Sequence, residues 1–483
     1  MLFNSIEFAI FLPIVFILYW FVTNRNLKLQ NILLVLASYV FYGWWDWRFL
    51  SLIIFSSSID YFVGIGLGKT NEQRKRKLLL LTSVFINIGL LWFFKYFNFF
   101  AESFANAFTL LGNPINSSRL NIILPVGISF YTFQTLSYSI DLYKRKIEPT
   151  KDIVSFFAFV SFFPQLVAGP IERATNFLPQ FYKKRVFEYD TALSGFTQIL
   201  WGLFKKMVIA DNCALIVNQI FSDYHQYSGS TLLLGAVLFA FQIYGDFSGY
   251  SDIAIGCAKL FGFKLKRNFA YPYFSRDIAE FWRRWHISLT TWFRDYVYIP
   301  LGGSHGSMWI KIRNIFIVFL VSGFWHGANW TFITWGFINA CCFLPLLLVK
   351  RNRTNIDIIA HDRLFPSIKE VFQMSVTFSI VVLGWIFFRS ENVMSAIEYI
   401  TIIFSKSLFS IPYAFGVGTS KAVLTISSII ILIAIEWFGR KKETPISIDN
   451  VNGKLIQWGI CFVMAIVIFL FMEQQQSFIY FQF

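Results

Sequence analysis

Apolar runs long enough to cross a lipid bilayer recur along almost the whole sequence. A membrane-spanning helix needs about 20 consecutive apolar residues. Clear runs lie at 6–22, 31–45, 49–66, 78–98 and 121–140. Further candidates, several interrupted by Gly, Pro or charge, lie at 153–168, 192–220, 231–261, 314–348, 370–388, 421–438 and 456–472. The pattern predicts an all-α polytopic membrane protein with about 11 to 13 transmembrane and re-entrant helices.

The composition excludes a soluble surface. Hydrophobic residues make up 56% of the chain and charged residues 14%, whereas a soluble domain carries about 25% charged residues. The formal net charge of +15 could suggest a nucleic-acid partner, but the basic residues cluster in short loops between apolar runs, which is typical of membrane topology. No fixed-period repeat and no Gly/Ser-rich or Pro-rich linker divides the chain, so we expect one membrane domain over residues 1–483 and no nucleic-acid partner.

Loop charge predicts the orientation. Arg25 and Lys28 follow the first apolar run, R-K-R-K stands at 74–77 after the third, and K-R-K stands at 144–146 after the fifth. Because basic loops stay in the cytoplasm, the N-terminus is expected outside. The first run has no Lys or Arg before it and no small-residue cleavage site after it, so we expect it to remain as a span rather than act as a signal peptide.

A polar band over approximately 244–330 interrupts the hydrophobic pattern. It begins with Y-G-D-F-S-G-Y-S-D at 244–252, and charged residues at membrane depth usually mark function. Asp246 and Asp252 have two interpretations. They could bind a cation or activate a hydroxyl, or, beside Gly245 and Gly249, they could cap a broken helix.

The band continues with alternating aromatic and charged residues from Asp277 to Tyr298. This amphipathic pattern predicts a segment lying along the membrane interface. Arg283, Arg284 and Arg294 would then face lipid headgroups or an anionic ligand. An interfacial anchor helix without a ligand is the alternative.

Two histidines stand apart from the three in polar loops. His326 lies in V-S-G-F-W-H-G-A-N-W between two apolar runs, and His286 lies forty positions earlier. Burial favours the neutral imidazole, which can accept a proton from an attacking hydroxyl as general base. His286 could orient the substrate or complete a proton relay. A structural hydrogen bond is the alternative for His326, and the spacing of neither histidine predicts a metal site.

Several motifs together resemble the membrane-bound O-acyltransferases, in the branch typified by the alginate O-acetyltransferase membrane subunit. The resemblance extends over nearly the whole chain. Each motif alone would be weak evidence, and only the motifs taken together are specific. Its motifs are M-L-F-N-S at 1–5, L-P-V-G-I-S-F-Y-T-F-Q at 124–134, F-F-P-Q-L-V-A-G-P-I at 162–171, F-W-R-R-W-H-I-S-L at 281–289, R-D-Y-V-Y-I-P-L-G-G at 294–303, G-F-W-H-G-A-N-W at 323–330 and the ending F-I-Y-F-Q-F.

The resemblance implies a helical bundle with interfacial amphipathic helices around a central channel. The buried histidine of the family falls on His326 and its upstream polar residue on His286. Acyl transfer would run from a cytoplasmic thioester, acetyl-CoA or another acyl thioester, to a hydroxyl of an extracytoplasmic polysaccharide or a relay protein. No bound cofactor is implied. The expected location is the bacterial cytoplasmic (inner) membrane, in contact with lipid, beside a periplasmic transferase or esterase-like partner.

With that activity, the remaining polar residues of the band receive expected roles. Asn329, Trp330, His286 and Trp285 are candidates for stabilising the oxyanion of thioester acyl transfer. The substrate-binding candidates are Trp285, Asn329, Trp330, Arg284, Arg294, Asp295, Asp246 and Asp252. Three alternatives stay open: a D-alanyl or other acyl transferase of the same fold with a carrier-protein donor, a transporter of polysaccharide or a small molecule, and a structural scaffold.

Overall fold

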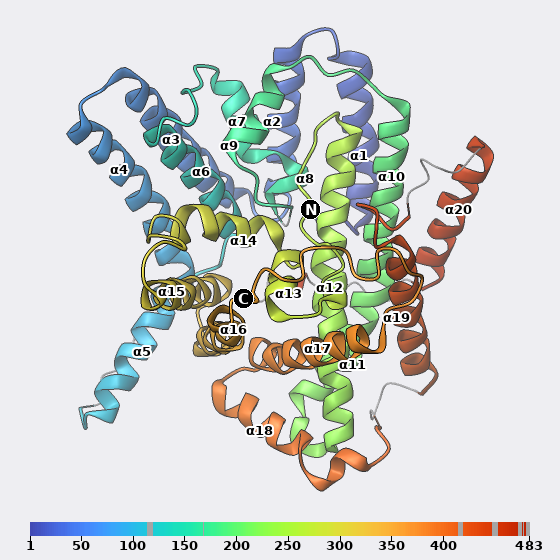
Figure 1. The fold of residues 1–483 in the computed structure, drawn as a ribbon. Helices are drawn as coiled ribbons and strands as arrows, with labels where there is room; N and C mark the ends of the chain where they lie inside the picture. The colour runs from blue at the N-terminus through green and yellow to red at the C-terminus, as the bar shows by residue number, and fades with distance from the viewer. Residues whose placement is uncertain are drawn as a thin grey trace. The chain divides into compact units, whose positions relative to one another are not determined.

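The computed structural model describes residues 1–113, 119–167, 169–413, 419–446, 453–471, 476, 478 and 479. Ala168 of the 162–171 motif and Tyr480–Phe483 of the C-terminal motif lie outside these residues. Within the described ranges the chain is helical and contains no strand (Figure 1). It forms two compact units, one of Met1–Gly195 with Cys257–Lys266, the other of Phe196–Gly256 with Arg267–Phe483.

Seven helical segments among the described residues are long and apolar enough to span a membrane. They are Trp47–Lys69, Gln73–Leu110, Gly229–Leu260, Met308–His326, Trp330–Leu348, Ile368–Arg389 and Ser420–Gly439. Shorter apolar helices lie at Ile6–Val22, Leu27–Gly43, Val393–Ile403 and Lys454–Leu470. The protein is therefore an all-α polytopic membrane protein, as the apolar runs predicted.

The first unit is built from helices that pack both on a sequence neighbour and on helices more distant in the chain. Here α3 (Leu50–Lys69) contacts both α4 (Gln73–Leu91) and α6 (Ile128–Tyr143), and α2 (Leu27–Gly43) contacts α7 (Ile153–Ser161). Its other helices are α1 (Ile6–Ile17) with the π-turn η1 (Leu18–Val22), α5 (Phe97–Leu110), α8 (Phe163–Leu166) and α9 (Ala174–Phe177).

One boundary in the first unit differs from the sequence prediction. The run predicted at 121–140 becomes helical only from Ile128. Gly127, which precedes the helix, has φ +74°, and a Cβ there would lie 2.8 Å from the backbone oxygen of Leu166. Pro125 has no N–H to donate within a helix. The apolar residues 121–127 are therefore a non-helical approach to α6.

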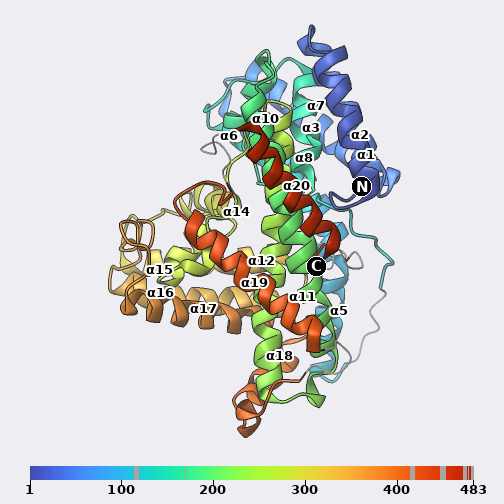
Figure 2. The same cartoon turned by 90° about the vertical axis from the view of Figure 1, so that its right-hand side faces the viewer.

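The second unit carries the polar band. It contains α11 (Asp211–Ser222), α13 (Ile278–Arg284), α14 (Ile287–Phe293), α15 (Met308–His326), α16 (Trp330–Leu348), α17 (Ile368–Arg389), α18 (Val393–Ile403), α19 (Thr419–Gly439) and α20 (Lys454–Leu470). The helices α15 and α16 run side by side, and α17 lies against α16 (Figures 1 and 2). The run predicted as one candidate at 314–348 is therefore two helices joined by a turn.

The long helix α12 (Gly229–Leu260) is unbroken, and it passes through the polar stretch at 244–252. Inside its most apolar window 83% of the residues are buried. The interpretation of Asp246 and Asp252 as caps of a broken helix is wrong. A Cβ at Gly249 would lie 2.7 Å from the backbone oxygen of Gly202 in α10 (Tyr189–Leu203), so this glycine permits close approach of another helix rather than a break.

Candidate active site

His326 is the last residue of α15, at the turn into α16. The side chain of Asn329 accepts a hydrogen bond from the N–H of Thr331 (3.0 Å) and thereby caps α16. Its Nδ2 donates to the backbone oxygen of Glu391 (2.8 Å). Both functional groups of Asn329 thus fix the turn that carries His326.

Two glycines bring α15 and α16 close enough to place this turn. A Cβ at Gly323 would lie 2.2 Å from the backbone oxygen of Phe332, and one at Gly336 would lie 2.4 Å from that of Phe319. Small residues at such a crossing allow membrane helices to pack with their backbones in near contact. The position of His326 therefore depends on a tight helix pair.

Aromatic rings surround the His326 imidazole, which is 3% exposed. The ring centroids of Trp325, Trp335 and Phe388 lie 5.0, 5.2 and 5.5 Å from that of His326. Aromatic packing of this kind places the imidazole in apolar surroundings with little access to solvent.

His286 occupies the break between α13 and α14, so the stretch from Asp277 to Tyr298 is two short helices and a π-turn (Arg294–Tyr298) rather than one continuous helix. Its φ of 44° and ψ of 54° are in the left-handed region, where a non-glycine residue is strained and persists only when its surroundings hold it. The neighbouring N–H of Ile287 donates to the backbone oxygen of Asn268 (2.9 Å).

The side chain of Asn268 fixes the His286 imidazole. Asn268 Oδ1 accepts hydrogen bonds from the N–H of Ser288 (3.3 Å) and from its hydroxyl (2.9 Å). It lies 3.1 Å from His286 Nδ1, while Asn268 Nδ2 donates to Ser251 Oγ (3.1 Å). An amide oxygen only accepts, so Nδ1 of the neutral ring carries the proton and Nε2 carries the lone pair.

The structure brings the two histidines together. Their ring centroids lie 6.4 Å apart, and the ring of Trp325 lies near both. Burial lowers the pKa of His286 to about 3, so this imidazole is neutral at physiological pH. The structure therefore places two buried imidazoles beside each other.

Trp285 is buried in an aromatic cluster beside His286. Its ring centroid lies 5.0 Å from those of Phe269 and Trp385 and 5.5 Å from that of Phe281. Trp330, by contrast, is 56% exposed at the start of α16. Of the aromatic residues predicted for the site, Trp285 packs directly against the wall that holds His286.

The predicted arginines make contacts within the protein, some to near sequence neighbours and some to a distant loop. Arg284 pairs with Glu280 (2.7 Å), and Arg294 pairs with Asp295 (2.7 Å) with its side chain largely exposed. Arg283 donates to the backbone oxygens of Asn352 and Asn355. These contacts tie α13 to the loop before α17, a structural task that the sequence pattern did not suggest.

The two aspartates of α12 lie beside lysines from the π-turn at Phe204–Ala210. Asp246 pairs with Lys206 at 2.8 Å, and Asp252 pairs with Lys205 at 2.5 Å. Buried carboxylates require such partners in an apolar environment. In the part of the chain that the structure describes, no three His, Cys, Asp or Glu side chains are grouped so as to hold a metal ion.

A small polar cavity adjoins the side of the site that contains Asn268. Its volume is about 20 Å³, enough for about one water molecule. Residues lining it include Lys205, Ser248, Ser251, Asp252, Arg267, Asn268 and Glu436. Sequence reasoning missed Asn268, Ser251 and Ser288. The isolated amide between Arg267 and Phe269 is a weak signal, because its partner His286 is eighteen residues away in sequence and is reached only by folding.

Comparison with known proteins places this arrangement in a family. The model of MBOAT, the membrane-bound O-acyltransferase family, matches residues 42–385. The chain belongs to the membrane-bound O-acyltransferase family. It is accordingly a multi-pass membrane enzyme that transfers an acyl group to a hydroxyl.

Several curated O-acyltransferases and related enzymes resemble the chain. The probable alginate O-acetylase AlgI of Pseudomonas putida is 35% identical over all of both chains. The peptidoglycan O-acetyltransferase of Helicobacter pylori is 36% identical over 82% of this chain and 79% of its own. The teichoic acid D-alanyltransferase of Bacillus subtilis is 31% identical over 46% of this chain and 58% of its own.

Proposed function

We propose that this O-acyltransferase moves an acetyl group from a cytoplasmic thioester, acetyl-CoA, to a hydroxyl of a polysaccharide outside the cytoplasmic (inner) membrane. The observation that carries the proposal is the pair of buried histidines with ring centroids 6.4 Å apart. The names of the alginate and peptidoglycan relatives support acetyl as the group and a polysaccharide as the acceptor.

His326 is the proposed general base. As the acceptor hydroxyl oxygen attacks the thioester carbonyl carbon, the neutral imidazole takes the hydroxyl proton. The tetrahedral intermediate then collapses with cleavage of the C–S bond, and the imidazolium returns the proton to the departing thiolate. The products are an ester and a free thiol, and His326 is again neutral.

His286 is the proposed orienting residue. Because its Nδ1–H points to Asn268, its Nε2 lone pair can accept a hydrogen bond, but the neutral ring has no second N–H to offer an oxyanion. We therefore favour alignment of the acceptor hydroxyl over oxyanion stabilisation for His286. For the oxyanion, Trp285 is favoured over Asn329 and Trp330, because Asn329 already caps α16 and Trp330 is exposed.

Polymer-bound acetate in cells with matched membrane amounts of each variant tests the proposal. His326→Ala removes the base and is expected to lower acetate at least 100-fold, within the range attributed to general-base catalysis of about 10²–10⁴. His286→Ala is expected to lower it by a smaller factor. The matched control is His305→Ala, which truncates an exposed loop histidine and should leave acetate unchanged. Normal acetate with His326→Ala would refute the assignment.

A second acyl donor has a specific observation in its favour. The similarity to a teichoic acid D-alanyltransferase supports an aminoacyl group, for which a carrier protein is the proposed donor. Incubation of the purified enzyme with acetyl-CoA and acceptor polymer separates the two, because only acetyl transfer from coenzyme A releases free coenzyme A. We expect release with wild type and none with His326→Ala.

The remaining proposals concern the surroundings of the enzyme. Loop charge supports an N-terminus outside and a cytoplasmic position for the loop 23–26 and for the segment 70–77, which includes the first turn of α4. An acceptor outside the membrane would require delivery by, or relay through, a second protein, for which a periplasmic transferase or esterase-like enzyme is the proposed class.

A further inference from the structure

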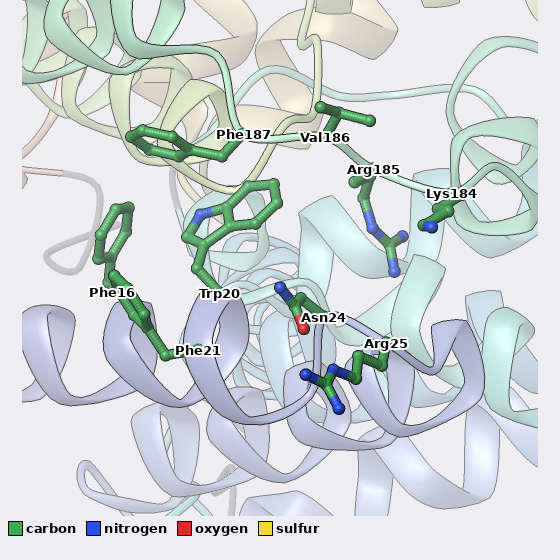
Figure 3. Close-up of a pocket in the computed structure, with 9 residues that line it drawn as sticks. All are labelled: Phe16, Trp20, Phe21, Asn24, Arg25, Lys184, Arg185, Val186 and Phe187. Atoms are coloured by element: carbon green, nitrogen blue, oxygen red, sulfur yellow. The ribbon is translucent and has the colours of Figure 1, made fainter.

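The first unit contains a half-open cleft of about 380 Å³, well within the size range of small-molecule sites. One wall comes from the end of α1 and η1, and the other from the segment before α10. The residues lining it are Phe16, Trp20, Phe21, Asn24, Arg25, Lys184, Arg185, Val186 and Phe187 (Figure 3). The proposed acyl-transfer chemistry uses none of them.

Arg185 is a buried cation that forms no ion pair with a carboxylate among the described residues. It is 7% exposed, and its Nη2 donates to Asn31 Oδ1 (2.7 Å) and Gln30 Oε1 (3.3 Å), both neutral amides. The guanidinium carbon lies 4.9 Å from the ring centroid of Phe263 and 5.6 Å from that of Tyr19. A buried charge is unfavourable unless a charge of opposite sign lies near.

Two further cations share the cleft with Arg185. Arg25 and Lys184 are exposed, and among the described residues no ion pair joins either of them, or Arg185, to a carboxylate. Arg185 Nε and Nη1 are buried and have no hydrogen-bond partner in the described part of the chain, so a ligand in the cleft would interact with Arg185 through its charge. Arg25 and Lys184 are the cations that could contact such a ligand directly.

The lining is divided into an apolar and a cationic end. Figure 3 shows the aromatic residues Phe16, Trp20, Phe21 and Phe187 on one side and Arg25, Lys184 and Arg185 on the other. Trp20 is held in place by a hydrogen bond from Nε1 to the backbone oxygen of Leu260 (2.9 Å) and packs against Phe187 with ring centroids 5.5 Å apart. Phe21 and Val186 remain 75% and 70% exposed.

We propose that this cleft binds an anionic phospholipid, with the phosphate between Arg25 and Lys184 and an acyl chain along Phe21, Val186 and Phe187. A soluble phosphate ester would satisfy the same cations, but it would leave the exposed apolar side chains without a partner. The cleft lies at the end of an apolar helix, where lipid headgroups meet basic residues.

Thermal denaturation of the purified full-length protein in detergent tests this, with phosphatidylglycerol, phosphatidylcholine or glycerol 1-phosphate added. We expect phosphatidylglycerol to raise the Tm of wild type, phosphatidylcholine to have a much smaller effect, and glycerol 1-phosphate to have none. The double variant Arg25→Gln/Lys184→Gln should bind phosphatidylglycerol about tenfold more weakly or worse, since each basic residue contributes about 1 kcal/mol near an anionic lipid.

The matched control is Lys28→Gln/Lys183→Gln, which removes two exposed charges close in sequence to Arg25 and Lys184 but does not alter the cleft lining. It should respond to phosphatidylglycerol like wild type. An equal weakening of phosphatidylglycerol binding in both double variants would mean that the lipid is attracted by the overall positive charge, and this would refute a specific site in the cleft. If glycerol 1-phosphate raised the Tm of wild type as much as phosphatidylglycerol does, the cleft would be a site for a soluble anion and the lipid proposal would be refuted.

Discussion

At the scale of single residues, one amide decides the state of His286. Asn268 Oδ1 accepts from Ser288 and lies 3.1 Å from His286 Nδ1, and the left-handed backbone of His286 is held at the same place. The sequence motif identified His286 but not this partner. Motifs record residues close in sequence, whereas the tautomer depends on a residue brought in from a different segment.

Asn268→Asp is expected to add an acidic limb to the pH–rate profile. A carboxylate at this position stabilises the imidazolium by about 1.4 to 4 kcal/mol, which raises the pKa of His286 from about 3 into the region of about pH 4 to 6. Above that pKa the ring is neutral and activity is retained. Below it, Nε2 is protonated, the acceptor lone pair is lost and kcat falls.

The profile is measured with purified enzyme between pH 4 and 8 at saturating donor. Wild type should show no limb from His286 in this range. Asn314→Asp is the control, because it introduces a carboxylate at another fully buried amide, which bonds to the backbone oxygens of Leu301 and Gly303. If Asn268→Asp and wild type had the same pH–rate profile, the side chain at position 268 would not control the protonation state of the His286 imidazole.

At the scale of helices, the sequence predicted most spans but misjudged the polar ones. Apolar length is a local property, so α3 and α17 follow from it directly. The continuity of α12 does not, because Asp246 and Asp252 are stabilised in mid-helix by partners from other segments, among them Lys206 and Lys205. The split of 314–348 likewise depends on the Asn329 cap and on helix contacts.

Gly336→Ala tests the close packing that positions His326. The new methyl group would lie 2.4 Å from the backbone oxygen of Phe319, which cannot move without shifting α15, so we expect a loss of about 1–3 kcal/mol and lower acyl-transfer activity. The measurement is Tm in detergent together with kcat.

Gly89→Ala in α4 is the matched control for this substitution. No atom lies within 4 Å of a Cβ at Gly89, and Ala has the higher helix propensity, so Tm should be unchanged or slightly higher. Equal behaviour of the two variants would mean that the α15–α16 crossing tolerates a wider spacing and does not constrain His326.

At the scale of the whole molecule, the membrane is part of the proposed reaction because it separates a cytoplasmic donor from an external acceptor. That proposal requires the orientation predicted by loop charge. Single cysteines introduced into a variant without the native cysteines test it. Trp47→Cys, at a 75% exposed position, should react with a membrane-impermeant maleimide in intact cells after removal of the outer barrier. Lys75→Cys, in the basic first turn of α4 with its side chain 67% exposed, should react only in inverted vesicles.

The two positions lie at opposite ends of α3, so one helix separates them and each serves as the control for the other. Reaction of Lys75→Cys in intact cells, with Trp47→Cys protected, would reverse the orientation and place the N-terminus in the cytoplasm. Reaction of both from one side would mean that α3 does not cross the membrane. Either result would refute the predicted orientation, in which the basic segments face the cytoplasmic donor. The assignment of His326 as the base would still be tested independently by polymer-bound acetate.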